Sequence, residues 1–177
     1  IAFVAAARIS PLQLQYSAGK GFLEKHTDSF NNVRASVYDL FAKVTYKMNG
    51  HHKVYGEAFY SMDNFGYGNT NGTSYDRMEW SNFIGNLHWD WEISERNALD
   101  VSVSYNSYGS NQNQEKVMEG VYNRLGVESH IEEAVAHAQY TSRWGKGWLF
   151  HLGARGTKSR FAPGSSKVYG EDGGSST

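Results

Sequence analysis

Cysteine is absent from the 177 residues, and only two prolines are present. Without cysteine the chain forms no disulfide, no thiolate metal site and no cysteine nucleophile. An excess of one charge is lacking as well, because 17 Lys and Arg residues stand against 18 Asp and Glu residues, a formal net charge of -1. A chain so balanced has no overall electrostatic attraction for nucleic acid. We therefore expect no nucleic-acid partner.

Long hydrophobic runs are also missing: no stretch approaches the roughly 18 apolar residues that a membrane-spanning helix needs. Residues 1–10 are apolar but lack the basic lead of a signal peptide. Aromatic residues nevertheless make up 15% of the chain, although its mean hydropathy is -0.60. Strands can carry these rings on one face and polar groups on the other, since their side chains alternate.

A period of two runs through most of the chain. Every second residue from Tyr38 to Met48 is apolar, whereas the residues between them include Asp39, Lys43 and Lys47. Asn49-Gly50 then marks a hairpin turn. A helix remains an alternative only for residues 113–125 and 131–138, which contain good helix formers. The expected strands cover residues 1–10, 37–48, 52–63, 80–94, 97–107, 130–141 and 147–158.

The expected connections alternate between short and long. Tight turns are expected near residues 49–52, 94–97 and 142–146, and long loops at 11–36, 64–79, 108–129 and 159–177. In an up-and-down antiparallel sheet this alternation places all tight turns at one end. Strands of about eleven to thirteen residues are longer than usual and fit tilted strands that cross hydrocarbon. The predicted fold class is therefore all-β, an antiparallel up-and-down meander of long strands that is part of a transmembrane β-barrel.

The aromatic residues gather near both ends of the expected strands. The two groups are Tyr46, Trp91, Trp144 and Trp148 near the tight turns, and Tyr60, Phe65, Tyr67, Tyr105 and Tyr108 near the long loops. Two aromatic belts are typical of strands that cross a bilayer. The alternative is a small soluble β-barrel that buries these rings and binds an apolar ligand inside.

Three stretches resemble the barrel of TonB-dependent outer-membrane receptors, in particular the nutrient-import receptors of glycan-using Gram-negative bacteria. They are VYDLFAKVTYKMNGHHKVYGEAFYSMDNFGYG, WSNFIGNLHWDWEISERNALDVSVSYNSYGSNQ and HIEEAVAHAQYTSRWGKGWLFHLGARGTKSRFAPG. The most specific pieces are Tyr38-Asp39-Leu40, the strand end at residues 61–65, and Trp80-Ser81-Asn82 before residues 85–87.

The resemblance implies a large barrel in the bacterial outer membrane, plugged by an N-terminal domain and energised through an inner-membrane complex. The implied partners are outer-membrane lipid, the plug domain and remaining strands of the receptor, a surface lipoprotein, and a small-molecule or oligosaccharide nutrient. Bacterial barrels have even numbers of strands, whereas about seven are expected here. We therefore expect the chain to be one portion of such a receptor.

The alternation assigns the side chains to two environments. Leu40, Leu87, Val101 and Leu152 are expected to face lipid, whereas the polar residues expected to face the lumen are Asp39, Lys43, Glu57, Asp63, His88 and Asp90. The expected loop 64–79 and its flanks interleave the rings of Phe65, Tyr67, Tyr75 and Trp80 with Asn64, Asn69, Asn71 and Asp76. Rings that stack on sugars beside amides that bind hydroxyls would suit a saccharide ligand. An ordinary polar loop is the alternative.

Catalytic and metal-binding patterns are weak. The pairs Asp90–Glu92 and Glu132–Glu133 could serve as the acid and base of a carbohydrate-active domain. A hydrated lumen face is the favoured explanation, because Asp90 and Glu92 recur in an alternating polar set with His88 and Asn86. His51-His52 point to opposite faces, and His130, His137 and His151 lack a further ligand at defined spacing. Nucleophile-elbow, phosphate-loop and dinucleotide motifs are absent. We expect no enzyme activity, no metal and no cofactor.

Overall fold

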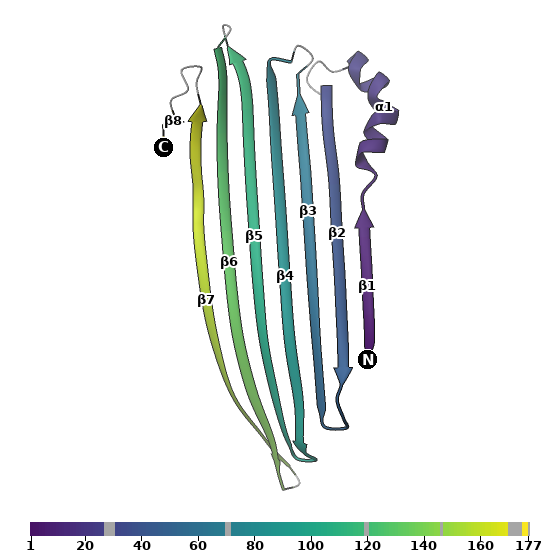
Figure 1. The fold of residues 1–177 in the computed structure, drawn as a ribbon, viewed down its shortest axis with the longest axis vertical. Coiled ribbons are helices and arrows are strands. Elements are labelled where there is room, and N and C mark those ends of the chain that lie inside the picture. The colour runs from purple at the N-terminus through teal and green to yellow at the C-terminus, as the bar shows by residue number, and fades with distance from the viewer. Residues whose placement is uncertain (27–30, 70–71, 119–120, 146, 170–174, 177) are drawn as a thin grey trace.

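In the computed structural model the chain forms a single antiparallel sheet with one helix at its edge (Figure 1). The structure describes residues 1–26, 31–69, 72–118, 121–145, 147–169 and 175–176. The elements are β1 (Ala2–Ile9), α1 (Leu12–His26), β2 (Asn31–Lys47), β3 (His52–Gly68), β4 (Ser74–Ser94), β5 (Asn97–Met118), β6 (Val121–Trp144), β7 (Trp148–Tyr169) and the two-residue β8 (Ser175–Ser176).

The strands follow one another in the sheet in chain order, from β1 to β8, and every neighbouring pair is antiparallel. This confirms the predicted all-β, up-and-down meander of long strands. The β2–β3, β4–β5 and β6–β7 turns lie together at the lower end of the sheet (Figure 1). The helix and the remaining connections lie at the upper end.

In two of the turns an asparagine side chain accepts hydrogen bonds from backbone amides of the turn. At the lower end, Asn49 Oδ1 accepts hydrogen bonds from the amides of His51 and His52, at 2.8 and 2.9 Å. At the upper end, Asn69 Oδ1 accepts from the amides of Thr73 and Ser74, at 2.9 and 3.1 Å. Short Asx side chains commonly satisfy turn amides in this way, which is why the sequence can reverse there.

No second layer covers either face of this sheet (Figure 1). Among the described residues, no apolar side chain is buried, and the one buried polar residue is Ser142. Apolar burial is the main favourable term in folding in water. The described part of this sheet has no apolar interior of its own to supply that term.

The strands extend much further than the sequence predicts. The expected loops at 64–79 and 108–129 are occupied by the upper ends of β3, β4, β5 and β6, and β7 covers much of the expected loop at 159–177. The expected helical alternatives at 113–125 and 131–138 are strand as well. These segments are rich in Gly, Asn, Ser and Gln, which have a low intrinsic preference for strands. The continuous backbone ladder to the neighbouring strand overrides that preference. Parts of these loops, including Asn71, lie outside the described residues.

The expected loop at 11–36 was also wrong, because it contains α1 and the start of β2. The carbonyl of Pro11 accepts hydrogen bonds from the amides of Leu14 and Gln15, at 2.9 and 3.0 Å, and so starts the helix. A Ser-Pro pair ahead of good helix formers is a helix-start signal.

Helix α1 lies beside the upper part of β2, beyond the end of β1 (Figure 1). There, Gln13 Oε1 accepts a hydrogen bond from the Ala35 amide at 3.0 Å, and Gln13 Nε2 donates to the Val33 carbonyl at 3.3 Å. One side chain therefore satisfies a donor and an acceptor of β2 that a neighbouring strand would otherwise pair. This is one way in which sheet edges are blunted.

Candidate functional site

The two faces of the sheet are the candidate functional surfaces, and the register defines them. Directly opposed residues lie on the same face of an antiparallel sheet. We call face A the face that carries Leu40, which is linked through Tyr60 to Phe83 by direct pairing. We call face B the face that carries Lys43, which is linked through Glu57 to Asn86.

Face A carries a continuous apolar band over the lower part of the sheet. No charged or amide side chain interrupts it. The band consists of every second residue of the ranges 3–9, 38–46, 54–62, 83–91, 99–105, 134–140 and 152–156. The predicted lipid-facing residues Leu40, Leu87, Val101 and Leu152 all belong to it.

The band is also the more exposed of the two surfaces. Leu40, Leu87 and Leu152 are 57%, 56% and 62% exposed, whereas Asp39 and His88, which alternate with members of the band, are half-buried. In a protein folded around an apolar interior these exposures would be reversed. In this sheet the apolar face A is therefore the outer face, and the polar residues lie on the opposite, less exposed face B.

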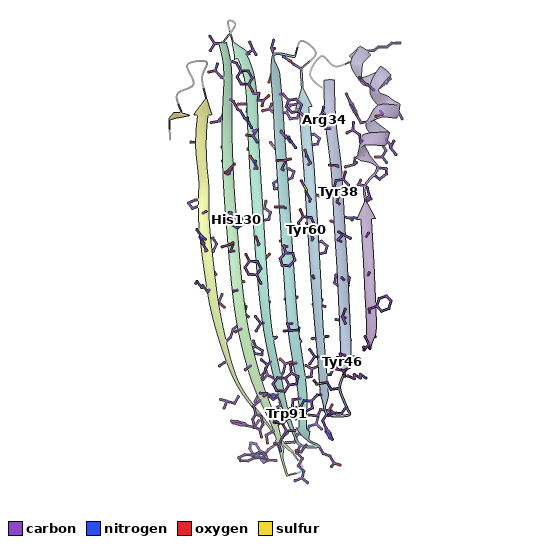
Figure 2. The ribbon with its side chains drawn as sticks, in the orientation of Figure 1. Arg34, Tyr38, Tyr46, Tyr60, Trp91 and His130 are labelled. Carbon is purple, nitrogen blue, oxygen red and sulfur yellow. The ribbon has the colours of Figure 1, made fainter. Side chains whose placement is uncertain are left out.

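Aromatic residues form the lower and upper margins of the band. The lower belt on face A contains Tyr46, Trp89, Trp91, Tyr140, Trp144 and Trp148. The upper belt contains Tyr38, Tyr60, Phe83 and Tyr105. Figure 2 shows Tyr46 and Trp91 near the lower end of the sheet and Tyr38 and Tyr60 near its middle. Phe65, Tyr67 and Tyr108, which the sequence analysis placed in the upper belt, lie on face B instead.

The height of the band approaches the apolar band of about 25 Å that transmembrane barrels present to lipid. From Phe83 to Trp91, eight residues apart on β4, the strand rises by about 27 Å at ~3.4 Å per residue. At the tilt of about 40° that membrane strands adopt, this corresponds to roughly 20 Å, and the neutral Ser81, two residues beyond Phe83 on the same strand, adds another step.

The lower belt ends in a small polar network that the sequence analysis missed. Asn97 Oδ1 accepts hydrogen bonds from the hydroxyls of Tyr140 and Ser142, at 2.8 and 2.7 Å. The Trp144 indole Nε1 donates to Ser142 Oγ at 2.7 Å. The polar tips of the rings are thus satisfied while their apolar bodies remain on the band. Such amphipathic placement is typical of rings at a membrane interface.

Above the upper belt, the chemistry of face A reverses. We call this part the upper extension; it comprises residues 34–36, 64–68, 75–81, 107–117, 122–132 and 158–162. Its charged side chains on face A are Arg34, Arg77, Glu79, Glu115, Arg124, Glu128, His130, Glu132, Lys158 and Arg160. Many are paired across the ladder or along the strand, including Arg77 with Glu79 at 2.5 Å and Arg124 with Glu115 at 3.8 Å.

Face B of the upper extension carries many large apolar side chains, although β5 places Ser110, Gln112, Gln114 and Lys116 on it. Its rings and aliphatic side chains are Phe65, Tyr67, Met78, Trp80, Tyr108, Leu125, Val127, Ile131 and Phe161. The apolar character of the sheet therefore changes sides between the band and the upper extension, on the same continuous strands.

Face B of the band carries an apolar row, Phe41, Phe59 and Ile84, directly opposed across β2 to β4, and its charged side chains are paired with one another. Glu57 receives hydrogen bonds from Lys43 at 3.0 Å and from Asn86 at 3.1 Å. Lys53 pairs with Asp90 at 3.1 Å. The Tyr55 ring stacks on His88 with centroids 4.5 Å apart. Such alternation of signs across the strands is what a hydrated or protein-filled surface can accommodate.

The six residues predicted to face the lumen all lie on face B. Lys43 is opposite Glu57, and Asp90 is opposite Lys53. Asp39, Asp63 and His88 occupy equivalent alternating positions on their strands, and Asp39 pairs with Arg8. The register thus brings this predicted group onto one surface.

The predicted ligand-binding group is divided between the faces. Phe65, Tyr67 and Trp80 lie on face B, and the Phe65 and Tyr67 ring centroids are 5.9 Å apart. The Asp76 carboxylate opposite Tyr67 raises the pKa of the Tyr67 phenol. Tyr75 lies on face A, where its hydroxyl covers Gly66. Three of the four rings therefore share a surface, on strands rather than in a loop.

Of the two candidate acid–base pairs, Asp90 and Glu92 share face B, whereas the other pair is divided. Glu132 and Glu133 lie on opposite faces. His137 lies beside Asp100, at 3.6 Å, whereas His151 contacts Thr141 at 3.0 Å. Within the described residues, no group of three or more His, Asp or Glu side chains is placed to hold a metal ion.

Comparisons with protein-family models, curated proteins and solved structures gave no match. No helix in the described part of the chain has the length and apolar character needed to cross a membrane.

Proposed function

We propose that this sheet is a section of the wall of a transmembrane β-barrel in the bacterial outer membrane, with the apolar band of face A against lipid. The observation that carries the proposal is the uninterrupted apolar band, bordered by two aromatic belts, on the more exposed face. In water such a surface would be a large aggregation-prone patch, since soluble monomers rarely expose contiguous apolar areas above a few hundred Å².

Face B then lines the interior of the barrel. Lys43, Glu57, Lys53 and Asp90 form paired charges on this face. Paired charges are compatible with water or a plug domain and incompatible with hydrocarbon. The same alternation would have to run the other way in a soluble barrel with an apolar interior, which is the alternative interpretation of the sequence.

We further propose that the barrel belongs to a nutrient-import receptor of the TonB-dependent type, with a transport rather than an enzymatic role. The support for this step is the sequence resemblance of residues 37–164. Its partners would be outer-membrane lipid, a plug domain, the remaining strands of the receptor and a surface lipoprotein. The rings of Phe65, Tyr67 and Trp80 on face B would take part in binding an oligosaccharide or other small nutrient above the membrane.

The membrane proposal is tested by mixing the purified chain with phospholipid vesicles and separating the vesicles on a density gradient. We expect the chain to float with the vesicles, to give a β-type circular dichroism spectrum, and to self-associate when detergent and lipid are left out. A compact, monodisperse monomer in plain buffer would contradict the proposal.

The receptor proposal has a separate test in the genomic reading frame around these codons. We expect the frame to encode a plug domain upstream and further alternating strands downstream. A barrel that closes with neither would contradict the TonB-dependent assignment and leave the membrane assignment standing.

A further inference from the structure

A shallow groove crosses face A at the top of the apolar band, between β5, β6 and β7. It has a volume of about 400 Å³, and its lining includes Val103, Ala134, Ala136 and Gly156. The groove exists because three of these residues are small, and a Cβ added at Gly156 would meet no other atom within 4 Å. Apolar lining and an open upper end give the groove the character of a site for a hydrocarbon chain.

Two cationic side chains lie at the upper end of this groove. Lys158, opposite Ala134 on the ladder, is part of the lining. Arg160 follows it on the same face, opposite Glu132, and its side chain is 79% exposed. The Arg160 Nη1 atom is 3.8 Å from Glu132, whose carboxylate also lies 3.2 Å from His130 and accepts from the Tyr105 hydroxyl at 3.1 Å. Glu132 is thus shared among several donors, and Arg160 remains open to a second anion.

This arrangement is confined to one strand. On face A, the first residues above the band are Ser36, Asn64, Ser81, Ser107 and Glu132 on β2 to β6, whereas β7 places Lys158 there. Along β7 the order is therefore Leu152, Ala154 and Gly156, then Lys158 and Arg160. An apolar stretch followed by cations is the complement of a lipid, whose acyl chains end at an anionic phosphate.

We propose that this groove, the lipid groove, binds one phosphate-bearing lipid of the surrounding leaflet. The acyl chain lies over Ala134, Ala136 and Gly156, and the phosphate is held by Lys158 and Arg160. Long cationic side chains at the edge of a hydrocarbon layer can extend along it and reach the headgroup. This inference rests on the proposed function, because it requires face A to be in contact with lipid.

The test uses the full chain in phosphatidylcholine vesicles that contain a small amount of spin-labelled lipid. Electron paramagnetic resonance measures the fraction of label that is immobilised at the protein surface, for labelled phosphatidic acid and for labelled phosphatidylcholine. We expect a preference for phosphatidic acid. Replacing both cations, Lys158→Gln with Arg160→Gln, should reduce that preference by more than about fivefold, since a single Lys or Arg near a membrane surface is worth about that factor.

Two further variants locate the site. Arg155→Gln removes a cation from the same strand but from face B, opposite His137, and should leave the preference unchanged. Gly156→Leu keeps both cations and fills the groove, and should reduce the preference as the double variant does. Retention of the preference in Gly156→Leu would overturn the groove and leave only a surface charge effect.

The outcomes separate this inference from the proposed function. If neither labelled lipid is immobilised and the chain does not float with vesicles, the membrane proposal fails and the lipid groove fails with it. If both labels are immobilised equally, or if Arg155→Gln loses as much preference as the double variant, the lipid groove alone is overturned. A preference that depends on Lys158, Arg160 and Gly156 but not on Arg155 supports it.

Discussion

The lower band and the upper extension are made of the same strands, yet they distribute apolar residues in opposite ways. In the band, face A carries Leu87 and Trp89 while face B carries His88 and Asp90. In the upper extension, face A carries Arg77 and Glu79 while face B carries residues such as Trp80. A soluble sheet packed on one side would keep one apolar face along its whole length.

The reversal is explained if the environment of face A changes along the strands. Lipid beside the band selects apolar side chains, and water above the membrane selects charged ones. The same change of environment explains why face A is apolar in the band and charged in the upper extension.

The largest effect is expected for a charge placed in the band. Leu87→Arg should lower the free energy of unfolding by roughly 2–4 kcal/mol in vesicles, because the guanidinium would lie near the middle of the hydrocarbon. Asn111→Arg, on the same face but in the upper extension between Glu79 and Glu128, should change it by less than about 0.5 kcal/mol. Urea unfolding of vesicle-bound protein measures both. Equal costs at the two positions would show that face A has one environment throughout.

A smaller effect is expected where a glycine is needed for packing. Gly66, in the upper extension, is buried, and a Cβ there would lie 2.4 Å from the Tyr75 hydroxyl and 3.3 Å from a backbone oxygen. Gly66→Ala should therefore cost about 1–3 kcal/mol, since it crowds a closely packed contact.

Gly156→Ala, in the band, is the matched control for Gly66→Ala. Open space around this position means that the change should be neutral or stabilising by up to about 1 kcal/mol. The same unfolding assay compares the two variants. A neutral Gly66→Ala would mean that Tyr75 does not cover Gly66.

The third prediction concerns the edge of the sheet beside α1. Gln13→Ala removes the two hydrogen bonds that cover the edge of β2 at Val33 and Ala35, at a cost of about 1 kcal/mol. Amide hydrogen exchange at Ala35 should become faster while exchange in the band stays unchanged. Gln15→Ala, on the same helix, should leave Ala35 protected. Unchanged exchange at Ala35 in Gln13→Ala would count against the edge-blocking role.

The smallest expected effect is an increase in the free energy of unfolding, from a substitution on face B of the band. Asp90 and Asp100 are directly opposed on β4 and β5, and like charges in that position repel. Asp100→Asn should therefore stabilise the sheet by about 0.2–1 kcal/mol at neutral pH. Asp90→Asn should gain less, because it also removes the 3.1 Å ion pair with Lys53. The opposite order in the unfolding assay would contradict this arrangement of face B.

Alternation of residue type was sufficient to predict the band from the sequence. In residues 38–48 and 83–93 the apolar set falls strictly on every second position, so the strands, their antiparallel order and the shared face of Leu40, Leu87 and Leu152 could all be expected. The six polar residues of face B followed from the same period. The turn near Asn49 followed from its Asn-Gly pair.

The upper extension could not be predicted in the same way. Its residues alternate between charged and ring-bearing positions with the faces exchanged, and its many Gly, Asn and Ser residues are typical of loops. Only the ladder to the neighbouring strand makes these segments extended, so local sequence contains little sign of it. For the same reason Tyr75 was grouped with Phe65, Tyr67 and Trp80. Neighbouring residues of a strand point to opposite faces, so the face of Tyr75 can be assigned only if its segment is known to be a strand. In an expected loop no such assignment is possible.

The most direct test of the central claim uses the absence of cysteine, which lets single cysteines be introduced and spin-labelled without background. Labels at Leu87→Cys, His88→Cys and Asn111→Cys in vesicles report collisions with oxygen, which concentrates in hydrocarbon, and with a water-soluble nickel complex. We predict high oxygen and low nickel accessibility at position 87, and the reverse at positions 88 and 111. Nickel accessibility at position 87 equal to that at position 111 would contradict the claim that the apolar band faces lipid.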